Sequence, residues 1–301
     1  QIVRATREYM DDLEKAVGKD RKDHGKKPLK PKEQEPETKE VKSSTTDPDS
    51  GYMVRDGKPK GFFYLDHRTT CGKHNLITDT HVTAANVHDS IPYLERLDRQ
   101  RERFGFETKA VGLDAGYMTA PICKGLDDRE IYGVIGYRRP NHIKGRFYKR
   151  EYVYDQQQDG YRCPNGQLLT YRTTNREGYR EYRSDSAICR TCPFLGQCTE
   201  NAHAIKTVTR HVWEDYREKV DSHRLSKTGK AIYKRRKETV ERSFADAKQL
   251  HGHRYIRMRG VLRAQEQCLL SAACQNMKKM ALLLCKPKKK SEKDPDTGLL
   301  K

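Results

Sequence analysis

The segment Tyr233-Lys-Arg-Arg-Lys-Glu-Thr-Val-Glu-Arg-Ser-Phe-Ala-Asp-Ala-Lys248 has the residue pattern of one amphipathic helix. Its apolar residues recur at helical spacing and predict one buried stripe: Val240, Phe244 and Ala247. Glu241 and Lys248 fall on an adjoining stripe, seven residues apart, so both point the same way. An acid at the edge of a buried face with a lysine on its side suits a metal-binding carboxylate beside a phosphate-binding cation.

A second acid follows a short apolar strand. Val111-Gly-Leu-Asp114-Ala-Gly-Tyr117 predicts a buried strand that ends at Asp114, and Gly116 allows the chain to turn beside it. The carboxyl ends of strands face the crevice where α/β sheets bind ligands. An Asp in this place is also a common turn or helix-capping residue, so the pattern alone leaves both roles open.

Together these segments resemble bacterial insertion-sequence DDE transposases, whose signature reads Tyr-x2-Arg-x3-Glu-x6-Lys. Glu241 and Lys248 match that signature with its full spacing. Arg236 keeps its distance from Tyr233 but lies one residue too far from Glu241, and Lys237 stands where the arginine would fall in strict register. Asp114 resembles the second acid of the family.

The resemblance implies a ribonuclease H-like domain that cleaves DNA strands and transfers them to a target. Asp114 and Glu241 would be the catalytic acids, and two Mg²⁺ or Mn²⁺ ions would be their cofactors, because hard oxygen ligands select such ions. Lys248, with Arg236 or Lys237, would contact DNA. The implied partners are transposon ends, target DNA and a second copy of the chain in a homodimeric transpososome.

The first acid of the family's triad has no clear counterpart. It should lie on a strand before a hairpin, and residues 1–46 offer only a helix and a charged stretch. We therefore expect it upstream of Gln1, in a chain truncated at its N-terminus. Asp47, Asp66 and Asp79 are the alternatives within the chain.

Four cysteines form a separate group, in Cys163-Pro-Asn-Gly166, Cys189-Arg-Thr-Cys192 and Cys198. The second pair has the spacing that wraps one metal ion, and four thiolates predict a structural Zn²⁺ site. The first half lacks a second cysteine, so His203 or His211 could replace Cys198 in closing the set. Free thiols and an iron–sulfur cluster are the alternatives. The remaining cysteines are expected to be small core residues.

The composition favours nucleic acid as a partner. Lys and Arg number 61 against 42 Asp and Glu, which gives a net charge of +19. No apolar run approaches the ~20 residues of a membrane span, and no signal peptide is evident. We expect a bacterial cytoplasmic protein associated with the nucleoid.

The order of the predicted elements favours an α/β fold, with a ribonuclease H-like mixed sheet flanked by helices and interrupted by a small Cys-rich insertion. Residues 61–70 and 75–83 predict a hairpin, and residues 86–90 cap a helix that runs to about residue 104. Residues 108–116 and 131–136 predict buried strands with a helix between them. Helices return after residue 225, and the last of them, near residues 262–284, should pack on the sheet through its apolar residues.

Four regions follow from this pattern. Residues 1–46 predict a helix ended by Gly18 and then a disordered basic linker, and residues 286–301 predict a disordered basic tail. The catalytic core is expected at 47–140 and 225–285, and the zinc-binding insertion at 141–224.

A basic stretch follows the signature helix. Arg254, Arg257 and Arg259 are spaced to line one side of a loop or strand, where they would contact phosphates or simply form a basic surface. Two other functions fit the same chain: a ribonuclease H-like nuclease without strand transfer, and a non-catalytic, zinc-stabilised DNA-binding remnant of a transposase.

Overall fold

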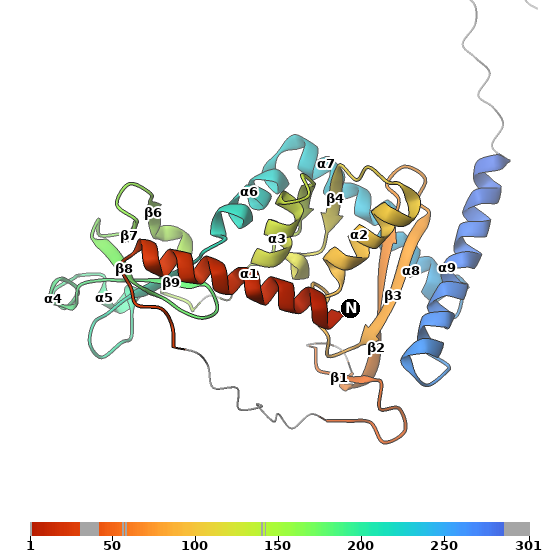
Figure 1. The fold of residues 1–301 in the computed structure, drawn as a ribbon, viewed down its shortest axis with the longest axis horizontal. Coiled ribbons are helices and arrows are strands. Elements are labelled where there is room, and N and C mark those ends of the chain that lie inside the picture. Colours follow the sequence, from red (N-terminus) through yellow and green to blue (C-terminus); the bar gives the residue numbers. More distant parts are fainter. Residues whose placement is uncertain are drawn as a thin grey trace, which may run out of the picture. The chain divides into compact units, whose positions relative to one another are not determined.

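The structure is a computed structural model, and it describes residues 2–30, 42–55, 57, 59–139, 141 and 143–285 (Figure 1). Residues 31–41 of the predicted linker, and the whole of the predicted tail, lie outside these residues. Contacts along the chain define two compact units: Gln1–Val41 with His88–Lys234, and Lys42–Val87 with Arg235–Lys301. Each unit is described by itself.

The first unit contains a βαβ motif. Strands β4 (Ala110–Leu113) and β5 (Tyr132–Ile135) pair in parallel, with the short helix η1 (Ala115–Tyr117) and α3 (Ala120–Asp127) between them. Ile122 and Leu126 of α3 are fully buried, as is Val134 of β5. The predicted strands and the helix between them are therefore confirmed, and the strand ends differ from prediction by one to three residues.

Two further helices cover this motif: α2 (Tyr93–Phe104) and α6 (Glu214–Leu225). Gly105 ends α2 in the left-handed conformation, as its sequence position predicted. Gly125 lets α2 approach α3, since an added Cβ would lie 2.4 Å from a methyl group of Leu94. Helix α6 begins before residue 225, so helical structure returns earlier than predicted.

An antiparallel sheet forms the predicted insertion. Its five strands follow the order β10-β9-β8-β7-β6. They are β6 (Val153–Asp155), β7 (Gly160–Arg162), β8 (Leu168–Thr174), β9 (Tyr179–Arg183) and β10 (Thr207–His211). Its core is largely aromatic: Tyr152, Tyr161, Leu169, Tyr182 and Val208. Three very short helices flank the sheet: η2 (Lys149–Glu151), α4 (Ser186–Cys189) and α5 (Leu195–Cys198).

Helix α1 (Ile2–Asp23) joins the insertion to the βαβ motif and runs through Gly18, which the sequence predicted to end it (Figure 1). Leu13 and Val17 are buried against Trp213 and Ala120. Two residues beyond Gly18, Asp20 accepts a 2.6 Å hydrogen bond from Arg180 on β9. One helical glycine costs about 1 kcal/mol, and these contacts outweigh it.

The second unit combines an antiparallel sheet with two helices. The sheet order is β1-β2-β3, with β1 (Gly51–Met53), β2 (Gly61–Thr70) and β3 (Ile77–Ala84). The helices are α8 (Val240–Leu250) and α9 (Val261–Leu284). The predicted hairpin is thus confirmed. In the described residues it forms a sheet separate from the parallel pair, whereas we had expected one continuous mixed sheet.

Helix α9 packs on β3, as predicted, but through different residues. Its buried side chains are small or polar: Ala264, Cys268, Ser271, Ala272 and Gln275. Leu262 and Leu270 are exposed instead. The small and polar side chains allow α9 to lie close to β3. The N–H groups of Val82 and Ile77 on β3 donate to the side-chain oxygens of Gln265 and Asn276, both at 2.8 Å. These amides also cap the strand's otherwise open edge.

The protein is a mixed α/β protein, consistent with a ribonuclease H-like domain that carries a Cys-rich insertion.

Candidate active site

Asp114 lies directly after β4, at the carboxyl end of the parallel pair. It is exposed, and its Oδ1 accepts a 2.7 Å hydrogen bond from the backbone N–H of Ala115. The residue therefore caps η1 and still presents a carboxylate to solvent. Both roles that the sequence left open are compatible with this geometry.

The turn at Asp114 lies against a residue of the signature segment. After β5, the N–H of Gly136 donates to the carbonyl of Leu113 at 3.0 Å. A Cβ on Gly136 would lie 2.5 Å from the hydroxyl of Tyr233 and 3.0 Å from the nitrogen of Ala115. Tyr233, on α7 (Lys227–Arg235), thus packs beside Asp114 only because residue 136 is glycine. Sequence reasoning missed Gly136; a glycine just after a buried strand was the available signal.

In the second unit, α8 presents Glu241 and Lys248 on its exposed side. Glu241 stands in the first turn with half of its side chain exposed, and Lys248 is exposed in the last turn. The fully buried residues of α8 are Ser243 and Ala247. Ser243 replaces Val240 at the centre of the buried face, because its hydroxyl accepts a hydrogen bond from Arg68 on β2 at 3.0 Å.

The signature segment is interrupted, whereas the sequence predicted one continuous helix. A single turn, η3 (Arg236–Glu238), separates α7 from α8, and Thr239 leaves helical geometry at φ −112° and ψ −96°. Its hydroxyl donates to the carbonyl of Arg235 at 3.0 Å. The break accommodates the one extra residue before Glu241 and brings Arg236 to 3.6 Å from the Glu241 carboxylate. Arg236, rather than Lys237, is therefore the cation beside the acid.

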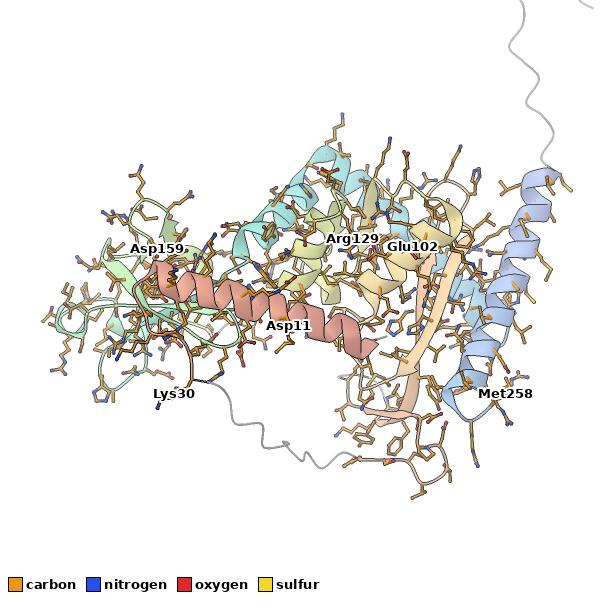
Figure 2. The ribbon with its side chains drawn as sticks, viewed as in Figure 1. Asp11, Lys30, Glu102, Arg129, Asp159 and Met258 are labelled. Carbon is orange, nitrogen blue, oxygen red and sulfur yellow. The ribbon has the colours of Figure 1, made fainter. Side chains whose placement is uncertain are left out.

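The other predicted DNA-binding residues are exposed. Lys237 lies in η3, and Arg254, Arg257 and Arg259 lie in the loop between α8 and α9, where Figure 2 labels Met258. The loop contains no strand among the described residues. Arg236 differs from these, because its side chain is only 14% exposed. Contact with DNA stays a prediction for all of them.

The three alternative first acids all lie in the second unit. Asp47 accepts hydrogen bonds from the Tyr64 hydroxyl at 2.8 Å and from the N–H of Gly260 at 3.1 Å. Asp79 is half-buried on β3. Asp66 is mostly buried, in a polar network with Arg68, Thr80 and His253. The position of the first acid upstream of Gln1 stays a prediction.

Asp66 meets His253 and Cys268 in a group whose ligand atoms lie within 4.8 Å of one another. Its carboxylate also accepts from Arg68 Nε at 2.9 Å and from the Thr80 hydroxyl at 2.8 Å. Burial alone would raise the pKa of Asp66, but hydrogen bonds from His253 and the positive charge of Arg68 outweigh it and lower that pKa. Burial raises the pKa of Cys268 well above its usual value. Because Arg68, Thr80 and His253 already donate to the Asp66 carboxylate at 2.8–3.2 Å, these contacts fit a structural polar network better than a metal site.

The four cysteines of the insertion meet at one pocket in the first unit. Cys163, Cys189, Cys192 and Cys198 all line it. Burial raises the pKa of Cys198, and the nearby thiols of Cys189 and Cys163 act in the same direction, against the Tyr152 hydroxyl and the charge of Lys206. Their sulfurs are spaced more widely than the ligand atoms of the Asp66 group.

Each unit therefore exposes one of the predicted acids: Asp114 at the end of a parallel strand in the first, and Glu241 on a helix with Lys248 in the second. Residues 162–281 match the family model described as the transposase DDE domain. This match confirms the predicted resemblance to DDE transposases over these residues. The matched residues include Glu241, Lys248 and the cysteine group.

Neither a curated protein nor a solved structure matches the chain. In the part of the chain that the structure describes, no helix is both long and apolar enough to cross a membrane.

Proposed function

We propose that the protein cleaves DNA strands at transposon ends and joins them to target DNA, with Asp114 and Glu241 as two of its metal-binding acids. The observation that carries this proposal is the geometry of α8. Glu241 is exposed, Arg236 lies 3.6 Å from it, and Lys248 stands on the same side of the helix, within the segment that matches the transposase DDE domain.

The donor chemistry fits the cofactor. Both Asp114 and Glu241 present exposed carboxylate oxygens, which are the ligands that Mg²⁺ and Mn²⁺ prefer. When bound, two such ions activate the attacking oxygen and stabilise the leaving oxygen of a phosphodiester. The backbone N–H of Ala115 holds the Asp114 carboxylate in place, and the packing of Tyr233 on Gly136 fixes the turn that carries it.

Cations on the second unit would position the DNA. Lys248 is exposed on the same side of α8 as Glu241, where it would contact a phosphate near the cleaved bond. Arg254, Arg257 and Arg259 add exposed positive charge in the following loop. Arg236 balances the charge of Glu241 and keeps its side chain oriented. The 61 basic residues outnumber the 42 acidic ones, and this excess of positive charge favours binding of DNA in general.

The test is a cleavage and joining assay with the full-length gene product, a labelled transposon end and Mg²⁺. Glu241→Gln and Asp114→Asn should each reduce cleavage on the order of 1,000-fold, because each removes several kcal/mol of transition-state stabilisation. DNA binding should persist in both variants.

Matched controls are available in each unit. Asp246→Asn changes an acid of the same helix that pairs with Arg242, and Asp128→Asn changes an acid that pairs with Lys124. Both should cleave normally. Cleavage that survives Glu241→Gln would refute the assignment. Cleavage without joined products would favour a nuclease, and no Mg²⁺-dependent cleavage at all would favour the non-catalytic remnant.

A further inference from the structure

The four cysteines of the insertion come from three separate elements. Cys163 follows β7, Cys189 ends α4, Cys192 follows that helix, and Cys198 ends α5. They nevertheless line the same pocket. The side-chain nitrogen of Asn165 lies 3.7 Å from the sulfur of Cys192, 27 residues away in sequence, so the two halves of the group are in contact.

Tight turns carry the thiols on both sides. The N–H of Gly166 donates to the carbonyl of Cys163 at 2.8 Å, and Gly166 takes the positive φ of 75° that such a turn requires. The N–H of Cys192 donates to the carbonyl of Cys189 at 3.1 Å. The Cys189 turn therefore brings two thiols to one side of the chain, and the Cys163 turn faces them with a third.

The segment between β9 and Ala204 has almost no apolar core. From Arg183 to His203, no residue is buried, and Ile188 and Phe194 are 45% and 38% exposed. Helices α4 and α5 have four residues each, far fewer than a helix needs to be stable in water without tertiary contacts. Apart from contacts such as that between Phe194 and Phe147, apolar packing contributes little to holding this segment in place.

The structure also decides which side chain completes the group. Cys198 lines the pocket, and its sulfur lies 3.1 Å from the Tyr152 hydroxyl. His211 is buried elsewhere, between the rings of Tyr179 and Trp213, where its Nδ1 accepts the N–H of Trp213 at 3.0 Å. His203 is exposed and does not line the pocket.

We propose that Cys163, Cys189, Cys192 and Cys198 bind one structural Zn²⁺ ion, which fastens the 183–203 segment to the five-stranded sheet. Four thiolates fill a tetrahedral site and leave no position for substrate, so the ion would have no part in the cleavage chemistry. Binding draws the sulfurs closer together and releases their protons. Lys206, whose ammonium donates to the carbonyl of Cys198 at 2.9 Å, places a positive charge beside the resulting anionic centre.

The test measures metal in the purified chain and needs no DNA, so its result is independent of the proposed transposase function. Elemental analysis should find one zinc ion per chain, and a strong chelator should remove it with a loss of protection from proteolysis at residues 183–203. After exchange with Co²⁺, the absorption spectrum should show tetrahedral thiolate coordination.

Variants identify the ligands. Cys192→Ser and Cys163→Ser should lose the zinc, whereas Cys198→His should retain it because imidazole is an equivalent ligand. Cys274→Ser and Cys285→Ser are matched controls, since both residues are exposed and lie outside the insertion. They should keep one zinc ion per chain.

Three results would overturn the proposal. They are a chain purified without zinc that cannot take up Co²⁺, iron in place of zinc at these cysteines, and zinc that persists in Cys192→Ser but is lost in His253→Asn. If the serine variants fail to fold, the zinc content and Co²⁺ spectrum of the unchanged chain still decide the question.

Discussion

Replacing Asp66 by asparagine tests whether this buried acid is structural or catalytic. The Asp66 carboxylate accepts hydrogen bonds from Arg68, Thr80 and His253 at 2.8–3.2 Å. The side chain of Arg68 is fully buried, and its second nitrogen lies 2.8 Å from the same carboxylate. An asparagine keeps the shape of the residue but removes its charge, so the guanidinium is left buried without a counterion.

Removing one partner of a buried ion pair costs about 3–5 kcal/mol, a large part of the roughly 5–15 kcal/mol that stabilises a typical domain. We expect Asp66→Asn to weaken the second unit by this amount. The control is Asp246→Asn, whose pair with Arg242 lies near the surface and contributes less than about 1 kcal/mol.

Native-state hydrogen exchange of peptides from β2 and β3 is the appropriate assay, because the two compact units need not unfold together. In Asp66→Asn the opening free energy derived from exchange should fall by about 3–5 kcal/mol. In Asp246→Asn it should match that of the unchanged chain. Equal protection in the two variants would refute the structural role and make Asp66 available again as a metal-binding acid.

Three further predictions follow from the same contacts. The pKa of Asp66 is lowered on folding, so the contribution of this carboxylate to stability is present above its ordinary pKa of 3.8 and is lost as the pH falls through the lower folded value. Hydrogen exchange measured at decreasing pH should show this loss in the unchanged chain and not in Asp66→Asn. Gly136→Val should displace Tyr233 from the Asp114 turn, destabilise the first unit by about 1–3 kcal/mol and reduce DNA cleavage; normal cleavage kinetics would show that this packing is dispensable. Lys248→Ala should lower the dependence of log affinity on log salt concentration by about one unit in DNA-binding titrations, and an unchanged slope would remove Lys248 from the DNA interface.

Local patterns in the sequence predicted a helix or strand well where its own residues show a clear pattern of apolar positions. The hairpin of β2 and β3 and the βαβ motif of β4, α3 and β5 were predicted close to their observed bounds, because alternating or continuous apolar runs there are flanked by turn residues. The end of α2 at Gly105 was predicted for the same reason.

Features that depend on contacts between distant segments were missed. Helix α1 continues past Gly18 because Leu13, Val17 and Asp20 find partners far along the chain. Helix α9 buries Cys268 rather than its leucines, because side-chain amides hold it close to β3. Neither contact leaves a periodic signal in the helix's own sequence.

The candidate site shows the same division. The exposed positions of Glu241 and Lys248 could be predicted from helical spacing, and that of Asp114 from the end of its strand. The break at Thr239 could not, because it depends on one hydroxyl that bonds the preceding turn. For that reason the sequence left Arg236 and Lys237 as alternatives. The structure places Arg236 3.6 Å from Glu241, and the roles of both residues toward DNA stay predictions.

The most direct test of the central proposal, that Asp114 and Glu241 are both metal-binding acids, is cleavage of the protein backbone by Fe²⁺. With added peroxide, iron bound in place of Mg²⁺ generates hydroxyl radicals that cut the chain beside its ligands, and mass spectrometry locates the cuts. We predict cuts near Asp114 and near Glu241 in the full-length protein, both suppressed by excess Mg²⁺, with the cuts near Asp114 lost in Asp114→Asn and those near Glu241 lost in Glu241→Gln. Cuts at only one of the two acids, or cuts near Glu241 that persist in Glu241→Gln, would contradict the account.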